Sequence, residues 1–352
     1  MECLYYSRPA ILIVLKYCCL AHTRVRVAGE LAYGGGTLVV ELEVDASGAV
    51  ALIGPNLTGK SLLLQCIYQR GEPRIGRPLQ APPELICDVE KGEYLAIYVD
   101  AYRVVSQLYE AAVRERLEDI RKSIGELSRI DDVEARRIGE NIYRVVKDVE
   151  KILGDFQFAL DAKSRADDLL LADAVRQFNE LYDEWLRKAE EARGEIKEIF
   201  DDFFPVVLSA TADGFAWTDR KAGALGRGLQ RLSTAFSPAL VALYAIYAYG
   251  IPQETYLLVE EPETHAHPLM AYFLGAYLRR LAKQSGGRLN VIVSTHSFDF
   301  LRGFWDEGVK VYVLRRFIEG GKILLKVAGQ WQGEGYVPGF SDTAIYKLLG
   351  LR

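Results

Sequence analysis

Cysteine is scarce in this chain and stops early. Five cysteines occur among 352 residues, all in the first quarter, and none belongs to a CxxC pair. This spacing excludes a disulfide framework and a structural zinc site with recognisable ligand spacing. It favours a reducing interior, so we expect a cytoplasmic protein. The five are Cys3, Cys18, Cys19, Cys66 and Cys87.

A membrane-spanning hydrophobic run and a strong net charge are missing as well. The apolar stretch Pro9–Ala21 is interrupted by Lys16 and is shorter than the ~20 residues that a spanning helix needs. It predicts a buried strand or an N-terminal extension, with a membrane anchor as the alternative, and we expect no membrane insertion. The formal charge of −5 argues against a surface that binds nucleic acid throughout, although it allows a local basic patch.

Three zones of different periodicity predict an α/β domain that is split by a helical insertion. Half of the residues are hydrophobic, enough for a sizeable core. Residues 1–101 contain strand patterns at TRVRVAG, TLVVELEV and AVALIG, with a glycine turn at 34–36. Residues 102–204 carry three apolar stripes with helical spacing, the third running from Phe178 to Ile199. In residues 205–352, strand patterns return at TYLLVEE, LNVIVSTHS, VKVYVLRR and KILLKVAG, with a helix over PLMAYFLGAYLRRLAKQS.

The strongest motif lies directly after AVALI. Residues 54–61, GPNLTGKS, fit G-x-x-x-x-G-K-[ST], follow an apolar strand and open an apolar-periodic helix. Glycines let successive N–H groups point at phosphate oxygens, and the helix N-terminus adds to the attraction. Lys60 is expected to reach the β- and γ-phosphates and Ser61 to bind Mg²⁺. A chance match in a glycine-rich loop is the alternative. The residues predicted to bind nucleotide here are Gly54, Pro55, Asn56, Leu57, Thr58, Gly59, Lys60, Ser61 and Leu62.

A second motif, YLLVEEPETHAHP, ends a predicted core strand with two carboxylates. Such a strand end is where a phosphate-loop site needs an acid for Mg²⁺. Glu260 would then position the metal, and Glu261 would orient and polarise the attacking water. His265 and His267 are two residues apart, which is poor spacing for a zinc chelate. A solvated loop after a core strand remains the alternative.

Two further polar segments are candidate anion contacts. His296 follows the predicted strand LNVIV in STHS, at the edge where parallel sheets bind ligands, and is a candidate γ-phosphate sensor, although a lone histidine is more often structural. In GALGRGLQRL, Gly226 and Gly228 precede a helix pattern from Leu229. They predict a nest of backbone N–H groups at a helix N-terminus, with a flexible turn as the alternative.

The order of these motifs resembles the ABC-type ATPases, in the branch of the SMC, RecF and OLD families. GPNLTGKS resembles the Walker A motif, LGRGLQR the signature, YLLVEEPETHAHP the Walker B motif, and VSTHS the switch-histidine motif. The EEPExHxHP form is more similar to the OLD-like branch than to transporters. The resemblance implies a P-loop NTPase fold with an ABC-ATPase-like mixed sheet and an inserted α-helical lobe. It covers about Thr23 to the end of the chain.

The resemblance also implies cofactors, roles and partners. ATP and Mg²⁺ would be held between two copies of the chain, so a homodimer is expected on ATP binding. Gly226, Arg227 and Gly228 would contact the γ-phosphate bound by the partner, Glu261 would be the catalytic base, and His296 the switch histidine. Two departures stand out: Gly226 replaces the usual signature serine, and the Q-loop glutamine has only Gln107 as a candidate.

Partner and pathway are less constrained. The helical insertion lacks the CxxC apex of a zinc hook, and the residues after His296 leave little room for an appended nuclease domain, so a nuclease is expected on another polypeptide. The resemblance points to DNA or an effector protein as partner, in repair or defence. The interleaved charges of Arg114–Lys122 favour a salt-bridged helix face over a phosphate track. An ATP-gated scaffold with little turnover and a transporter ATPase subunit are the alternatives.

Overall fold

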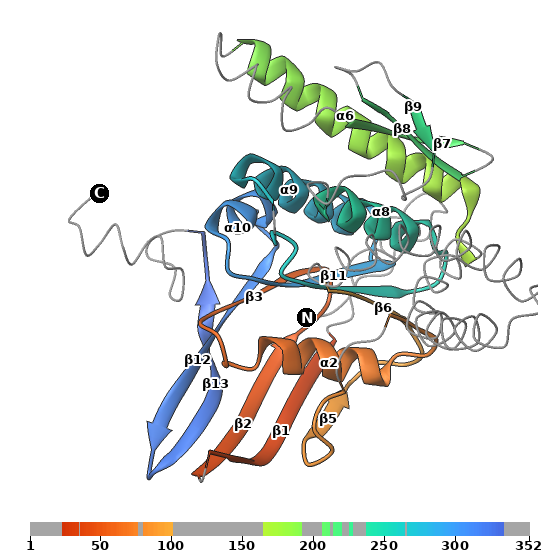
Figure 1. The fold of residues 1–352 in the computed structure, drawn as a ribbon. Coiled ribbons are helices and arrows are strands. Elements are labelled where there is room, and N and C mark those ends of the chain that lie inside the picture. Colours follow the sequence, from red (N-terminus) through yellow and green to blue (C-terminus); the bar gives the residue numbers. More distant parts are fainter. Residues whose placement is uncertain are drawn as a thin grey trace, which may run out of the picture.

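The computed structural model confirms an α/β fold with one large mixed sheet (Figure 1). It describes residues 23–34, 36–76, 80–100, 165–191, 206–211, 214–219, 225–227, 237–264 and 266–333. Among these residues, ten strands form the large sheet in the order β4-β6-β10-β11-β3-β12-β13-β2-β1-β5. They are β1 (Arg24–Tyr33), β2 (Gly36–Asp45), β3 (Ala49–Ile53), β4 (Arg74–Ile75), β5 (Ile86–Val89), β6 (Leu95–Asp100), β10 (Thr255–Glu260), β11 (Leu289–Thr295), β12 (Lys310–Glu319) and β13 (Lys322–Trp331).

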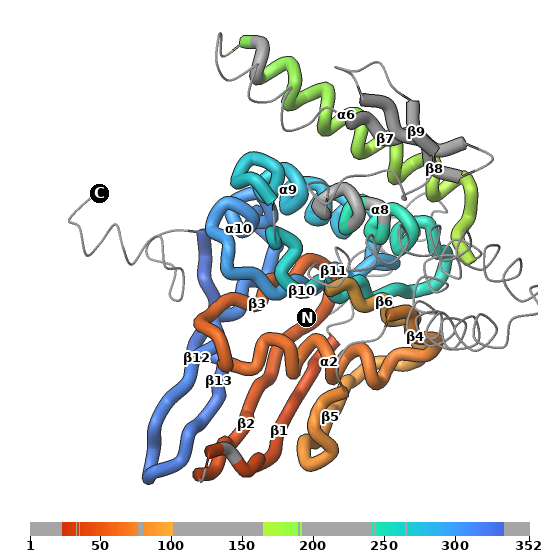
Figure 2. The backbone as a smooth tube through the Cα atoms, viewed as in Figure 1, coloured from red at the N-terminus to blue at the C-terminus, as the bar shows by residue number. Residues whose placement is uncertain are grey.

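The sheet has a parallel half and a largely antiparallel half. All strands of the first half, from β4 through β6, β10, β11 and β3 to β12, run parallel to one another. The β12–β13 hairpin then reverses direction, β13 pairs in parallel with β2, and β2, β1 and β5 continue antiparallel. Figure 2 shows the hairpin β12–β13 beside the hairpin β1–β2. The parallel half therefore aligns the carboxyl ends of β3, β6, β10 and β11 along one edge, where ligands bind in such sheets.

Five helices lie around this sheet in the described part of the chain. One face is covered by α8, α9 and α10, with α6 packed on them, and α2 lies on the other face (Figure 1). The helices are α2 (Lys60–Arg70), α6 (Asp168–Glu191), α8 (Ser237–Gly250), α9 (Pro268–Gln284) and α10 (Phe298–Phe304). A separate three-stranded antiparallel sheet consists of β7 (Val206–Thr211), β8 (Gly214–Asp219) and β9 (Leu225–Arg227).

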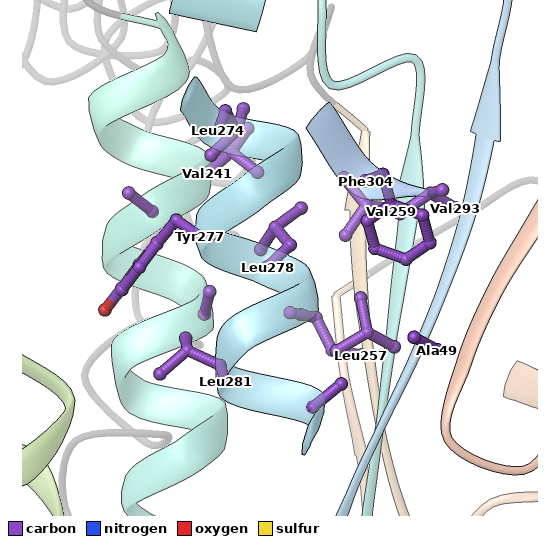
Figure 3. Packing of buried hydrophobic residues seen from close by; sticks show 14 of the residues in the cluster. Ala49, Val241, Leu257, Val259, Leu274, Tyr277, Leu278, Leu281, Val293 and Phe304 are labelled. Atoms are coloured by element: carbon purple, nitrogen blue, oxygen red, sulfur yellow. The ribbon is translucent and has the colours of Figure 1, made fainter. Parts of the chain in front are cut away.

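Alternation along the buried strands divides the core into two layers. In β10, Leu257 and Val259 belong to the core under α8 and α9, whereas Tyr256 and Leu258 face the core that contains α2. Figure 3 shows the first layer, where Leu278 of α9 lies over the strands. This burial on both faces explains why these strands appear in the sequence as continuous apolar runs.

Helix α6 confirms the described part of the third predicted stripe and packs on the core. Phe178 contacts Phe273 and Tyr277 of α9 edge to face, with ring centroids 5.4 and 5.1 Å apart. Such aromatic pairs contribute about 0.5–1.5 kcal/mol beyond their area burial. Because these rings are buried, α6 shares one hydrophobic cluster with the sheet. The first two stripes, Pro9–Ala21 and Gln107 lie outside the described residues.

Helices α9 and α10 touch through their backbones. A Cβ at Gly275 would lie 2.4 Å from the carbonyl oxygen of Phe300, and a Cβ at Gly303 would lie 2.0 Å from that of Tyr272. No side chain fits at either distance, so glycine is required on both helices. The two helices follow the segments that carry Glu261 and His296, respectively.

Candidate nucleotide site

The predicted phosphate loop connects β3 to α2 in the required strand–loop–helix order. Gly54 has φ 145° and a Cβ there would lie 2.3 Å from the carbonyl oxygen of Leu314. Gly59 has φ 94° and a Cβ there would lie 2.6 Å from Cδ1 of Leu42. Both glycines are therefore fixed by backbone conformation and by space. No side chain caps the N-terminus of α2, which leaves its first turn suited to an anion.

Lys60 is the buried cation of this loop. Its Nζ donates hydrogen bonds to the carbonyl oxygens of Gly54 and Pro55, each at 2.9 Å. Burial lowers the pKa of Lys60 to about 8, while the charges of Glu261 and Glu260 oppose that shift. The loop thus folds around Lys60 and holds its ammonium group at the N-terminus of α2.

The structure brings Glu260 next to Ser61, although 199 residues separate them. The Ser61 hydroxyl donates to Oε1 of Glu260, and the Tyr98 hydroxyl donates to Oε2 at 2.5 Å. Tyr98 comes from β6, Glu260 from β10 and Ser61 from α2, so three separate elements converge on one carboxylate. A hydroxyl and a carboxylate side by side are oxygen donors of the type that Mg²⁺ prefers, and Mg²⁺ usually completes its shell with water and phosphate.

Glu261 has an unusual backbone conformation at the end of β10. Its φ is +48°, in the left-handed region that non-glycine residues rarely adopt, and its N–H donates to the carbonyl oxygen of Ser294 at 2.9 Å. Burial, followed by the neighbouring Glu260 charge, raises the pKa of Glu261. A raised pKa makes a carboxylate a better proton acceptor. Strained conformations of this kind concentrate at functional sites.

His296 faces Glu261, with its Nε2 3.6 Å from Oε1 of Glu261. Burial, and then the Lys60 charge, lowers the pKa of His296 to about 4, so the imidazole is neutral at pH 7. Its backbone is held by Glu263, whose Oε1 accepts from the N–H groups of His296 at 2.7 Å and Ser297 at 3.0 Å. The segment after β10 and the segment after β11 are thereby joined.

Lys60, Ser61, Glu260, Glu261 and His296 line one cavity of about 320 Å³, a size typical of small-molecule sites. Of the predicted loop residues, Gly54 and Pro55 are not part of its lining. The loop, the two carboxylates and His296 form one end, and aliphatic side chains with Arg316 form the other. The lining comprises Leu31, Leu38, Asn56, Leu57, Thr58, Gly59, Lys60, Ser61, Leu62, Glu260, Glu261, Ser294, His296, Arg316, Ile323 and Leu325.

The signature-like segment lies elsewhere. Gly226 and Arg227 are in β9, where they pair with Trp217 and Ala216 of β8, and Gly228 lies outside the described residues. The predicted nest of N–H groups before a helix is therefore not what these two residues form, because successive N–H groups of a strand point in opposite directions. Neither residue lines the cavity.

Of the two histidines in the Walker B-like segment, the structure describes His267. His267 caps α9, its Nδ1 accepting from the N–H of Leu269 at 3.3 Å, while His265 lies outside the described residues. No cluster of three or more His, Cys, Asp or Glu side chains suited to a metal occurs in the described residues. The oxygen donors at Ser61 and Glu260 are thus a partial set, of the kind that a metal bound together with phosphate requires.

Two site residues were missed by the sequence patterns, and a third, Ser294, was predicted only as part of the polar segment STHS. Tyr98 is one of several apolar-looking residues in LAIYVD, and Glu263 is the third acid of EEPE. Ser294 is buried at the end of β11, lines the cavity, and its Oγ has no hydrogen-bond partner among the described residues. It lies beside Glu260 in the β10–β11 ladder, one residue before the end of β11.

Comparisons with known proteins find resemblance in structure and none in sequence. No protein-family model and no curated protein sequence matches the chain. The SMC head domain from Thermotoga maritima matches with a TM-score of 0.39 and 11% identity over 87% of this chain and 98% of that one. An Smc head domain with an extended coiled coil from Pyrococcus furiosus, bound to the C-terminal domain of ScpA, matches with a TM-score of 0.38 and 12% identity. This match covers 93% of this chain and 98% of that one. An ATP-binding cassette of an ABC transporter in its ADP conformation matches with a TM-score of 0.36 and 14% identity. This match covers 86% of this chain and 89% of that one.

At such scores and identities, these neighbours assign no family and no activity, and the functional conclusion rests on the cavity itself. No helix in the described part of the chain combines the length and the apolar character needed to span a bilayer.

Proposed function

We propose that the protein binds and hydrolyses ATP with Mg²⁺ at the cavity between α2 and the carboxyl edge of the parallel strands. The observation that carries this proposal is the contact of Ser61 with Glu260 beside the buried Lys60. A phosphate loop supplies anion binding, and a carboxylate from a distant strand supplies the metal side, which is the minimum that phosphoryl transfer from a nucleotide requires.

Each residue has a role in this proposal. Lys60 and the backbone N–H groups of Gly54 and residues 56–62 bind the triphosphate, since Pro55 has no N–H. Ser61 and Glu260 hold Mg²⁺, which would neutralise phosphate charge when bound. Glu261 orients a water and accepts its proton. Neutral His296 donates or accepts a hydrogen bond next to Glu261, and Glu263 holds its backbone in place.

The decisive experiment compares the chain with two variants. Lys60→Ala should lose nucleotide binding, because it removes the buried cation of the loop. Glu261→Gln should keep nucleotide binding and lose multiple-turnover hydrolysis by at least about 100-fold, the lower range for a positioned base. Phosphate release measured alongside equilibrium binding of a fluorescent ATP analogue separates the two effects. Hydrolysis by Glu261→Gln at the parental rate would show that another group activates the water.

The proposed assembly is a homodimer that closes on ATP and acts on DNA or on an effector protein. It rests on the motif order and on the position of Gly226 and Arg227, which pair with β8 and do not line the cavity of their own chain. Arg227→Asp should lower hydrolysis without lowering the affinity of the monomer for ATP. Restored activity in mixed dimers of Arg227→Asp with Lys60→Ala chains would support shared sites, and sedimentation that stays monomeric with ATP would refute them.

A further inference from the structure

The cavity has a second end that the phosphate chemistry leaves unexplained. Its wall there is an aliphatic stripe formed by Leu31 of β1, Leu38 of β2, and Ile323 and Leu325 of β13. Leu31, Leu38 and Ile323 are only partly buried, so apolar surface remains open in a cavity whose other end is charged. Exposed apolar surface beside convergent polar groups is characteristic of a ligand site.

The strand register places the whole aliphatic stripe on one face. Leu31 lies opposite Leu38, and Leu38 lies opposite Ile323. Leu325 is two residues further along β13 and therefore on the same face. A Cβ at Gly59 would lie 3.4 Å from Cδ1 of Leu325, so the stripe begins directly beside the phosphate loop.

Arg316 lies next to this stripe. It is opposite Leu325 in the β12–β13 ladder and lines the same cavity. Its side chain is exposed and makes no hydrogen bond or ion pair with any described residue. The nearby lysines of β13 differ, because Lys322 pairs with Glu30 and Lys326 with Glu41. Arg316 is thus a cation at the edge of an apolar wall, without a partner among the described residues.

A flat aromatic heterocycle fits these two features. One ring face can pack on the aliphatic wall while the guanidinium beside that wall contacts the ring, since cations are attracted to aromatic rings within about 6 Å. We propose that the aliphatic stripe and Arg316 form a nucleobase site for purines that discriminates little between adenine and guanine. This inference rests on the proposed function, because the phosphate end anchors the same ligand.

The expected tolerance follows from the side chains at this end. Aliphatic groups offer no donor or acceptor to a base edge, and Arg316 can only donate. Adenine and guanine both carry an N7 acceptor, and guanine adds O6, so GTP should bind at least as well as ATP. Pyrimidines offer less ring area to the stripe, and CTP should bind more weakly than either purine nucleotide.

The experiment uses three ligands and a matched pair of variants. Arg316→Ala is compared with Arg315→Ala, since Arg315 is the adjacent exposed arginine on the opposite face of β12 and also lacks a partner among the described residues. Mg-ATP, Mg-GTP and Mg-tripolyphosphate are titrated by calorimetry. Tripolyphosphate has the charge of the nucleotide without its base, so it isolates the phosphate end.

Arg316→Ala should weaken ATP binding about two- to tenfold, weaken GTP binding by at least the same factor, and leave tripolyphosphate binding unchanged. Arg315→Ala should change none of the three. Unchanged nucleotide affinity in Arg316→Ala, an equal loss for tripolyphosphate, or a more than 100-fold preference of the parent for ATP over GTP would each overturn the nucleobase site. In those cases the phosphate site would stand. Failure of the parent to bind any of the three ligands would instead overturn the proposed function and this inference with it.

Discussion

Tyr98→Phe tests whether Glu260 serves a metal. The change removes only the hydroxyl that donates to Oε2 of Glu260 at 2.5 Å and keeps the ring, which packs edge to face on Tyr68 with centroids 5.8 Å apart. Hydrogen bonds to charged groups contribute about 1.5–3 kcal/mol, and loss of a group that orients a metal ligand typically lowers metal affinity about 10- to 100-fold. We therefore expect the Mg²⁺ midpoint of ATP hydrolysis to rise by that factor.

The assay is a Mg²⁺ titration of hydrolysis at saturating ATP, with metal-free ATP binding measured in parallel. Tyr94→Phe is the matched control. It lies four residues earlier in the chain, in the same core layer, and its hydroxyl donates to the carbonyl oxygen of Ile67 at 2.6 Å, away from the cavity. Both variants lose one buried hydroxyl, so both should lose similar stability. Equal Mg²⁺ midpoints in Tyr98→Phe and Tyr94→Phe would refute the assignment of Glu260 to the metal.

Two further predictions concern Glu261 and His296. Glu261→Gly should be more stable than Glu261→Ala by about 1 kcal/mol, because a φ of +48° is strained for alanine but not for glycine. Denaturant unfolding of the two variants measures this difference directly. Equal free energies of unfolding would mean that the backbone at this position is not strained. Because the folded pKa of His296, about 4, lies below its usual value, its contribution to stability is complete above pH 6.5 and is lost as the pH falls toward 4. His296→Gln should therefore flatten the fall in unfolding free energy between pH 6.5 and 4, and an unchanged slope in thermal melts over that range would contradict the burial argument.

Most of the fold could be predicted because its signals are local and strong. The strands β3, β10 and β11 are continuous apolar runs, and such runs indicate strands buried on both faces. The approach of Glu260 to Ser61 follows from the same reasoning, since the carboxyl ends of β10 and β3, which both run parallel to β11 between them, lie at the same edge of the sheet.

The remaining features depend on register and tertiary pairing. Arg316 reaches the cavity only through the β12–β13 ladder, whose register shifts between Val313 and Leu314, and no sequence pattern predicts that irregularity. The contact of Tyr98 with Glu260 depends on which way a core ring points. GALGRGL suits either a glycine nest or a strand, and the pairing with β8 decides for the strand at Gly226 and Arg227.

The glycine contact between α9 and α10 joins the two helices that follow Glu261 and His296 in the chain. Because Gly275 and Gly303 let the helix backbones touch, neither helix can slide or separate without leaving a void, and Glu263 ties the segments together at the cavity. Glu261 and His296 are therefore linked both at the cavity and through the helices that follow them, so in the proposed reaction cycle we expect them to move together relative to Lys60. A methyl group added at Gly275 would push α9 and α10 apart, and we expect it to lower hydrolysis without contacting the nucleotide.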